Sequence, residues 1–530
     1  MYDEMQPLNR RDFLKLSATA AAAAAIPGFA GCASPGALRA PDIDYSGRLI
    51  LGNCNVVDVI GGRVIRDRDI VIEKGRIISI APSGATVDGV RGTIDARGAF
   101  LLPGLIDAHC HLTIQSCAAF RLLDVSKYVR QIKTNGMMQV AAGVTTVRDT
   151  GGFPKMLHDL VRDYEKGSLT GPRVVYCNAI ANIDGGHPDI KSSDVSAMGP
   201  ITMAFTGSMT LDFTDRRDLM KKLAENVEHG ASFVKISMDN RSLICGRGAI
   251  AVYDDDDLKA IFDFAEKKGM PVAAHTLMHY GMKRVLNYPI NSLEHITGDA
   301  DVADGEIDLM RKKGVVIVPT LQIGHNFAFR ERYAGLPERY ATPFIENELR
   351  IKYDYLSRGN HGAYDPHLHR LNMESIGWFR DPGCEEMPNQ KKYMTDPEIG
   401  FEYLVHGPSN ARRMKDAGVL MGCGTDSGVP CHYHGSLWRE MEFMSRAGFS
   451  SREIVRMATA DNAAIIGMKD SIGRIEEGMR ADLALFREDP LMKIEALRDP
   501  LLVLIDGRVK AGGDALRHRD DAAGVGHYAL

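Results

Sequence analysis

Two histidines separated by one residue, His109 and His111, lie at the end of a short apolar run that starts at Gly104. Side chains alternate between the two faces of a β-strand, so both imidazoles would point the same way. Such a pair can bind one metal ion, although the motif alone says little because it occurs in many proteins. Four more residues able to bind or bridge metal ions lie in or just after other apolar runs: Lys235, His275, His295 and Asp426.

Lys235 is the least expected member of this set because it lies in an otherwise apolar run at 233–236. Burying a lone ammonium group is energetically expensive, so the lysine must be neutralised or paired. One interpretation is a shared metal centre. The alternative is a set of hydrogen-bonded core histidines beside a buried ion pair. Five separate runs that end in ligand-capable residues favour the metal centre, since chance seldom produces that pattern.

The middle of the chain alternates short apolar runs with polar stretches, a pattern typical of strand–helix repeats. We expect helices at 215–229 and at 254–268, the second beginning at a run of aspartates that suits a helix N-terminus. Eight parallel strands predict an α/β fold, a (β/α)8 TIM barrel, with catalytic groups at the C-terminal strand ends. A doubly wound open sheet competes, but no GxGxxG motif follows the first strand. The eight expected strands are 104–109, 144–148, 173–176, 233–236, 271–275, 292–295, 315–319 and 419–423.

The two ends of the chain after residue 40 have a different pattern, with short runs rich in β-branched residues. Gly61-Gly62 and Lys74-Gly75 separate several of these runs and are typical of hairpin turns. We therefore expect one small β-sandwich assembled from 41–100 and 472–517, around a barrel formed by 101–471. The runs are 48–51, 63–65, 69–72, 76–80, 481–486 and 501–509.

One connection within the expected barrel is far longer than the others and covers about 321–417, between the seventh and eighth strands. A long connection on the catalytic face of a barrel usually contributes a lid or a specificity element. The alternative is a solvated helical insertion without a catalytic part, and the sequence leaves both open.

Residues 1–40 are expected to be a leader rather than part of the fold. Arg10 and Arg11 precede an Ala-rich apolar run that is too short to span a bilayer comfortably, and this arrangement resembles a twin-arginine export signal. We expect export to the periplasm, and a lipoprotein-like cleavage site leaves a lipid anchor at Cys32 open. The nine cysteines form no CxxC pair, so we expect mostly buried free thiols, with a disulfide between Cys423 and Cys431 left open.

The composition excludes several classes of protein. Apolar residues make up 45% and charged residues 25% of the 530 residues, which is ordinary for a globular protein. The 64 basic and 69 acidic residues give a formal net charge of -5, and outside the N-terminus no basic stripe suggests a nucleic-acid partner. We expect a small-molecule substrate and no nucleic acid, and the sequence leaves a homo-oligomer open.

Together these motifs resemble the amidohydrolase superfamily over nearly all of the chain after the leader. Within it, the imidazolonepropionase-like and prolidase-like branch, which includes ochratoxinase, is the most similar. The insertion at 321–417 departs from a compact member of that branch and leaves the choice of substrate open. The likeness rests on Pro103-Gly-Leu-Ile-Asp-Ala-His-Cys-His111, Val144-Thr-Thr-Val-Arg-Asp149, Gly185-Gly186-His187, Val234-Lys235-Ile236, Ala274-His275, Leu293-Glu-His295, Gly424-Thr-Asp-Ser427 and the tail from Gly473 to Leu483.

The resemblance implies a site for two divalent metal ions. Reaction of the bridging lysine with carbon dioxide would give a carboxylated side chain, an anion in place of an unwanted buried cation. Zinc is the metal expected for a nitrogen-rich site of this kind, with manganese, cobalt and iron as alternatives. The implied ligands are His109, His111 and Asp426 for one ion, and His275 and His295 for the other, with Lys235 as the bridge.

The same resemblance implies a mechanism. A water shared by two dications loses a proton near neutral pH, and Asp426 would take that proton and pass it to the leaving amine. His187 is the candidate for holding the substrate carbonyl or carboxylate, with a structural loop histidine as the equal alternative. Arg148 and Asp149 suggest a salt bridge behind the metal ligands.

The predicted reaction is hydrolysis of an amide, a C–N rather than an ester bond, in a small molecule. The branch resemblance favours a dipeptide or an N-acyl amino acid, cleaved by a hydroxide that bridges the metals. Opening of a cyclic amide or a lactone is the second enzymatic hypothesis. A periplasmic solute-binding lipoprotein is the non-enzyme alternative, although a binding protein has no need of a bridged pair of ions.

Overall fold

The structure is a computed structural model. It describes residues 47–114, 124–188, 208–211, 213, 215–243, 249–357, 363–381, 397–430, 432–512 and 528–529. The expected leader at 1–40, Cys32 and Cys431 lie outside these residues. Four cysteines within them, Cys54, Cys110, Cys177 and Cys423, are buried free thiols. No helix in the described ranges is long and apolar enough to cross a membrane.

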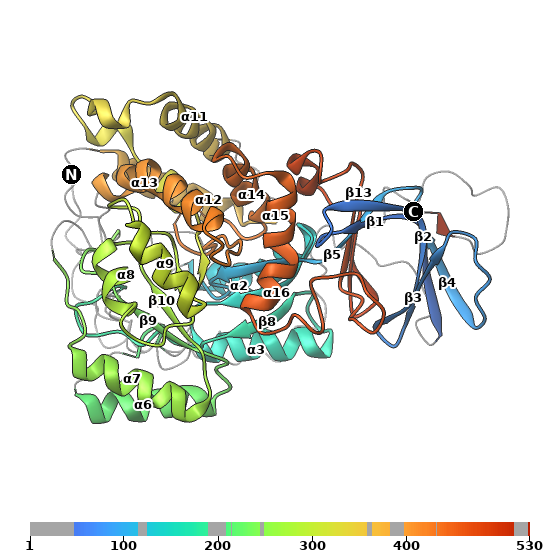
Figure 1. Ribbon diagram of the computed structural model, residues 1–530, viewed down its shortest axis with the longest axis horizontal. Helices are drawn as coiled ribbons and strands as arrows, with labels where there is room; N and C mark the ends of the chain where they lie inside the picture. The colour runs from blue at the N-terminus through green and yellow to red at the C-terminus, as the bar shows by residue number, and fades with distance from the viewer. Residues whose placement is uncertain are drawn as a thin grey trace, which may run out of the picture.

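Strands from both ends of the chain form one nine-stranded sheet at one end of the molecule, where blue and red ribbons meet in Figure 1. Its main path runs β15-β14-β13-β5-β1-β2-β3, while β4 pairs with β1 and with β16. The sequence thus predicted correctly that distant segments pair. The strands are β1 (Arg48–Asp58), β2 (Arg63–Glu73), β3 (Arg76–Pro82), β4 (Val90–Asp95), β5 (Phe100–Pro103), β13 (Leu483–Phe486), β14 (Leu502–Ile505), β15 (Arg508–Gly512) and β16 (Tyr528–Ala529).

The two faces of β13 serve two different cores because side chains alternate along a strand. Leu483 and Leu485 join the apolar cluster of the nine-stranded sheet. Ala484 and Phe486 join the larger cluster of the α/β part. The turn between β2 and β3 also follows the sequence, since Lys74 and Gly75 both have left-handed φ values, 50° and 77°, as a two-residue hairpin turn requires.

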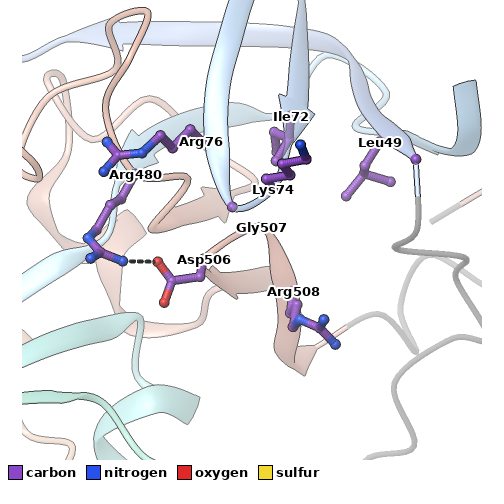
Figure 2. Close-up of a pocket in the computed structure, with 10 residues that line it drawn as sticks. Leu49, Ile72, Lys74, Arg76, Arg480, Asp506, Gly507 and Arg508 are labelled. Carbon is purple, nitrogen blue, oxygen red and sulfur yellow. Dashed lines mark hydrogen bonds and ion pairs between the residues drawn. The ribbon is translucent and has the colours of Figure 1, made fainter. Parts of the chain in front are cut away.

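A cavity of about 330 Å³ opens on this sheet, where the β2–β3 and β14–β15 turns meet (Figure 2). Basic side chains line much of it, and the Arg480 guanidinium donates to the Asp506 carboxylate at 2.6 Å. None of the expected metal ligands lines this cavity. The cavity therefore belongs to the nine-stranded sheet and is separate from the site expected from the sequence.

The α/β part contains two parallel sheets. The three-stranded sheet has the order β6-β7-β8 and the four-stranded sheet the order β12-β11-β10-β9. Every one of these strands coincides with an expected strand to within two residues at each end. They are β6 (Leu105–Cys110), β7 (Val144–Asp149), β8 (Arg173–Tyr176), β9 (Val234–Ser237), β10 (Val272–His275), β11 (Ser292–Glu294) and β12 (Val316–Val318).

Isolated parallel bridges connect the two parallel sheets on both sides. Ala181, beyond β8, pairs with Ile236 on β9. The expected eighth strand at 419–423 is not a regular strand, but Met421 pairs with Ile317 on β12. Further along the same segment, Ser427 pairs with Cys110 on β6. The eighth segment therefore lies between the last and the first strand of the series.

Helices alternate with these strands and cover them (Figure 1). The two helices expected from sequence are present, and the Asp254 side chain caps α7 by accepting from the backbone N–H of Asp257. The helices are α2 (Val125–Ala141), α3 (Pro154–Lys166), α6 (Arg216–Glu228), α7 (Asp255–Lys268), α8 (His279–Val285), α9 (Asp304–Lys313), α14 (Leu437–Arg446), α15 (Ser451–Arg456) and α16 (Asn462–Ile465).

The long connection after β12 is helical in its described residues. Residues of α11 and α12 form an apolar cluster with Tyr128 and Met138 of α2 and with Tyr433. The insertion is thus packed onto the α/β part, while its role as a lid stays a prediction. Its α-helices are α10 (Gln322–Phe327), α11 (Pro343–Ser357), α12 (Pro366–Arg380) and α13 (Pro397–Asp416).

Candidate metal centre

The two histidines at the end of β6 point their Nε2 atoms at one carboxylate oxygen. Asp426 Oδ1 lies 3.2 Å from His109 Nε2 and 2.9 Å from His111 Nε2. The other ring nitrogens are already used. His109 Nδ1 donates to the Glu294 carboxylate at 2.8 Å, and His111 Nδ1 donates to the Gly151 carbonyl at 2.6 Å.

These hydrogen bonds set the chemistry of the site. In a neutral imidazole one nitrogen donates and the other accepts, so both Nε2 atoms are acceptors that face the acceptor Asp426 Oδ1. Acceptors at this distance need a cation between them, either a proton or a metal ion. With a proton between them, the hydrogen bond and charge of Asp426 outweigh burial and raise the pKa of His111, and the two histidines hold the pKa of the buried Asp426 well below its usual range.

Two further histidines stand beside this group. The His295 ring lies 4.7 Å from the His109 ring and 4.5 Å from the His275 ring, centroid to centroid. His295 Nδ1 is 2.6 Å from the Thr320 hydroxyl, which fixes the ring. Ligand atoms of His109, His295 and Asp426 lie within 4.8 Å of one another. Burial lowers the pKa of both His275 and His295, which keeps them in the neutral form that binds metals.

Lys235 lies on β9 and is 2% exposed. Its Nζ atom has no hydrogen-bond partner among the residues that the structure describes, and burial lowers the pKa of the ammonium group to about 8. A buried amine without a partner is the state expected of a lysine whose functional form is something other than an ammonium ion. The residue fits a carboxylated bridge, in which added oxygens would face cations.

His187 lies next to the histidine group and not in it. Its ring stacks on His275 with 4.2 Å between centroids, and its Nδ1 atom is 2.7 Å from the Ser242 hydroxyl. Burial lowers the pKa of His187, so the ring is neutral. The structure therefore places this sequence-predicted residue beside His275, and its role in holding the substrate stays a prediction.

The segment after the eighth strand can approach β6 only because of its glycines. A Cβ on Gly424 would lie 2.8 Å from His109 Cβ, and one on Gly428 would lie 2.6 Å from the His111 carbonyl oxygen. Between them Asp426 has a φ of 57°, a left-handed conformation that costs an ordinary residue about 1–3 kcal/mol. His295 has a φ of 73°, so two of the expected ligands are held in uncommon backbone conformations.

Asp107 connects β6 to the segment that contains Asp426. Its buried carboxylate accepts from the Thr425 hydroxyl at 2.7 Å and from the Thr425 backbone N–H at 3.0 Å. The Asn462 side chain adds a second connection by donating to the Ile106 and Cys423 carbonyls at 2.6 Å and 2.8 Å. These bonds position Asp426 opposite His109 and His111.

Glu294 is a functional candidate that sequence reasoning missed. It is fully buried, and it accepts from Arg148 at 2.5 Å, from the Ser292 hydroxyl at 2.7 Å and from His109. Burial alone would raise the pKa of Glu294, but Arg148 and Lys235 hold it well below its usual range. The salt bridge expected near Arg148 and Asp149 is therefore present with a different acid, since Arg148 pairs with Glu294 and the Asp149 carboxylate accepts from backbone N–H groups.

Asp239, just beyond β9, is the second residue that was missed. Its carboxylate accepts from the backbone N–H groups of Leu277 and Met278 at 2.8 Å and 3.0 Å. Its Oδ2 atom approaches His275 Nε2 to 3.1 Å, at an angle that does not form a regular hydrogen bond. Neither acid was visible in the sequence because the partners of each come from other strands or loops.

Comparison with known proteins identifies the family of the chain. Residues 100–510 match the amidohydrolase family, and residues 7–27 match the twin-arginine translocation signal, so the chain contains an export signal. An uncharacterized protein of Mycobacterium tuberculosis is 24% identical over 416 residues, covering 78% of this chain and 85% of the relative. Imidazolonepropionase of Salinispora tropica is 22% identical over 296 residues, which is 55% of this chain and 71% of that enzyme.

Solved structures share the fold. A Xaa-Pro dipeptidase with bound methionine in its active site superposes with a TM-score of 0.66 at 21% identity, covering 87% of this chain and 99% of that one. The ochratoxinase of A. niger superposes with a TM-score of 0.62 at 17% identity, covering 88% and 96% of the two chains. The resemblance inferred from the sequence is confirmed, and the chain is a member of the amidohydrolase family of hydrolases.

Proposed function

We propose that the protein is a two-metal hydrolase that cleaves an amide bond in a small molecule. The observation that carries this proposal is the pair of acceptor nitrogens, His109 Nε2 and His111 Nε2, facing the acceptor Asp426 Oδ1. A divalent cation satisfies all three atoms at once. The neutral His275 and His295 rings and the partnerless Lys235 Nζ supply what a second ion and a carboxylated bridge need.

The bridges between strands support a closed (β/α)8 barrel. Seven regular strands and the 419–423 segment follow one another around a ring. Three isolated bridges join the parts that the regular sheets leave apart: Ala181–Ile236, Ile317–Met421 and Cys110–Ser427. In such a barrel the expected ligands occupy the C-terminal strand ends, where catalytic residues of the fold lie. We assign 101–471 to this barrel, and 41–100 with 472–517 to the β-sandwich.

The donor set suggests which residues would hold each ion. His109, His111 and Asp426 would hold one, His275 and His295 the other, and carboxylated Lys235 would lie between them. Nitrogen-rich sets of this kind favour zinc. Two bound divalent ions would supply an acidified water and polarise a carbonyl group.

Asp426 is the candidate general base and acid. Its carboxylate stays ionised because His109 and His111 lower its pKa, and it lies at the one point where both imidazoles converge. From there it can accept a proton from the attacking water and deliver it to the leaving nitrogen. His187, neutral and stacked on His275, is placed to donate to or accept from the substrate's polar group.

A dipeptide or an N-acyl amino acid is the proposed substrate class. The structural likeness to a dipeptidase with bound methionine supports it, as does the amidohydrolase family match. A cyclic amide or lactone is the second candidate, supported by the imidazolonepropionase likeness. Membership in a family of hydrolases gives no support to a solute-binding lipoprotein.

The export signal supports a periplasmic site of action, with a lipid anchor at Cys32 as a further proposal. Metal-loaded mature protein should be screened against dipeptides, N-acyl amino acids, cyclic amides and lactones, with amine or acid release as the readout. Release of amino acids from the first two groups supports the proposal. Turnover of lactones alone would overturn the substrate class while leaving the metal centre intact.

A further inference from the structure

Gln322 is a buried amide whose hydrogen-bonding groups are unused. It opens α10, directly after the seventh strand, and is 1% exposed. Within the described part of the chain, neither its Nε2 nor its Oε1 atom has a hydrogen-bond partner. Leaving a buried donor or acceptor unsatisfied costs about 1–3 kcal/mol, so such a residue in a well-packed protein calls for an explanation.

The position of Gln322 is fixed beside the metal centre. Two residues earlier, the Thr320 hydroxyl holds His295 Nδ1 at 2.6 Å. The backbone N–H of Gln322 donates to Glu440 at 2.9 Å, and that of Leu321 donates to the same carboxylate at 2.7 Å. The first turn of α10 is therefore tied to α14 on one side and to an expected metal ligand on the other.

Ser436, the residue that precedes α14, is the second unused polar group. It occupies the N-cap position but makes no side-chain cap hydrogen bond, and its buried Oγ atom has no partner in the ranges that the structure describes. Residues three and four apart share one face of a helix, so Ser436, Arg439 and Glu440 lie on the same side of α14. Glu440, on that side of α14, accepts from the backbone N–H of Gln322. Gln322 and Ser436 therefore both lie near the contact between α10 and α14.

Arg439 supplies a positive charge near the contact between α10 and α14. It is 5% exposed, and its guanidinium lies over the Tyr355 ring of α11 at 3.5 Å from the centroid. Burial raises the pKa of the neighbouring Glu440 to about 8, so that acid is largely uncharged at neutral pH. An amide N–H, a hydroxyl and a buried guanidinium together suit an anion with two acceptor oxygens.

We propose that Gln322 and Ser436 form a subsite for the carboxylate of the substrate's amino-acid part, in the positive field of Arg439. The inference rests on the proposed amide hydrolysis and narrows it to amides that bear a free carboxylate. The subsite is as buried as the metal centre itself, where His109 is 1% and His295 2% exposed. Thr320, which contacts His295 and lies two residues before Gln322, connects the subsite to the proposed metal ligands.

The test compares the binding of free L-amino acids with that of their amides to metal-loaded full-length mature protein, by calorimetry. Wild type is expected to bind the acids about tenfold or more tightly, since hydrogen bonds to a charged group are worth about 1.5–3 kcal/mol. Gln322→Leu and Ser436→Ala should each remove most of that preference. Equal binding of acid and amide by wild type, or no binding of either, would overturn the subsite.

A stability measurement separates recognition from a structural role. Gln322→Leu should leave the Tm of ligand-free protein unchanged or higher, because it replaces an unsatisfied amide with an apolar side chain of similar shape. The matched control is Gln131→Leu, whose amide is equally buried but donates to Asn135 and accepts from Asp365, so it should lower the Tm without changing acid binding. A fall in Tm for Gln322→Leu as large as the control's would contradict the proposal. Metal content is measured in parallel, since a chain that binds no metal would overturn the proposed function rather than the subsite alone.

Discussion

The nine-stranded sheet and the candidate metal centre contain buried residues of opposite character. On β13, Leu483 and Leu485 pack into an apolar cluster, and no strand of that sheet contributes a buried side-chain atom without a hydrogen-bond partner among the described residues. At the strand ends of the α/β part, Lys235 and His275 contribute such atoms.

The sheet and the candidate metal centre also differ in backbone geometry. Left-handed residues of the sheet, such as Lys74 and Asp506, lie in turns next to glycine, where that conformation is ordinary. His295 and Asp426 adopt it within the centre, beside buried polar groups. Strain and unsatisfied groups persist where the surrounding structure holds them in place, which is the usual cost of a preorganised site. The sheet is therefore organised for stability and the centre for binding and chemistry.

The largest effect should follow a change that removes only chemistry. Asp426→Asn keeps the shape of the side chain but removes the base, so turnover should fall by about 10³-fold or more. Metal content and Tm should stay close to wild type. The matched control is Asp506→Asn in the sheet, which should leave turnover unchanged in the same assay. Near-full activity of Asp426→Asn would show that another group moves the proton.

Glu294→Gln should affect both binding and stability. It leaves the buried Arg148 without its acid, which typically costs about 3–5 kcal/mol. It also loosens the orientation of His109, which should weaken metal affinity about 10–100-fold. Urea unfolding of metal-free protein measures the first effect and competition with a chelator measures the second.

A double variant sharpens that result. Replacing Arg148 with Gln together with Glu294→Gln removes the uncompensated charge, so much of the lost stability should return while metal affinity stays low. If the double variant is as unstable as the sum of its parts, the pair does not act as a unit.

Leu483→Ala should lower stability without lowering turnover. The side chain is fully buried in the sheet cluster, and such truncations cost about 2–5 kcal/mol. Turnover per folded molecule, measured well below the Tm, should be that of wild type. A loss of turnover without a loss of stability would mean that the sheet shapes the centre directly.

The smallest effect is expected at the cavity of Figure 2. Arg480 and Asp506 pair at 2.6 Å, but their side chains are 34% and 42% exposed. Exposed pairs of this kind contribute about 0.2–1 kcal/mol, less at high salt. Arg480→Ala should lower the free energy of unfolding by no more than this, with a difference that shrinks in high salt.

The same contrast explains what the sequence could predict. Strand positions follow from local apolar runs, so β6 to β12 were located closely, and so was the pairing of the chain's two ends in one sheet. The irregular eighth segment was less predictable, because Gly424 and Gly428 let its backbone approach β6 in a way that no local pattern encodes.

Pairings within the site depend on residues that are far apart in the chain. Glu294 meets Arg148 across 146 positions, and nothing near either residue indicates the other. Gln322 shows no sequence feature at all, since an unused amide is recognisable only when its surroundings are known. The candidate ligands were predictable because each lies in or just after a short apolar run, where a histidine, lysine or aspartate is unusual.

We propose that a carboxylated Lys235 bridges two metal ions. The most direct measurement combines metal analysis of the purified protein with ¹³C NMR after exposure to labelled bicarbonate, for wild type and for Lys235→Met. We expect about two divalent ions per chain and a carbamate signal in wild type, with loss of the signal and of at least one ion in the variant. An active wild-type protein that binds two ions without a carbamate signal, or a Lys235→Met variant that keeps both ions, would contradict it.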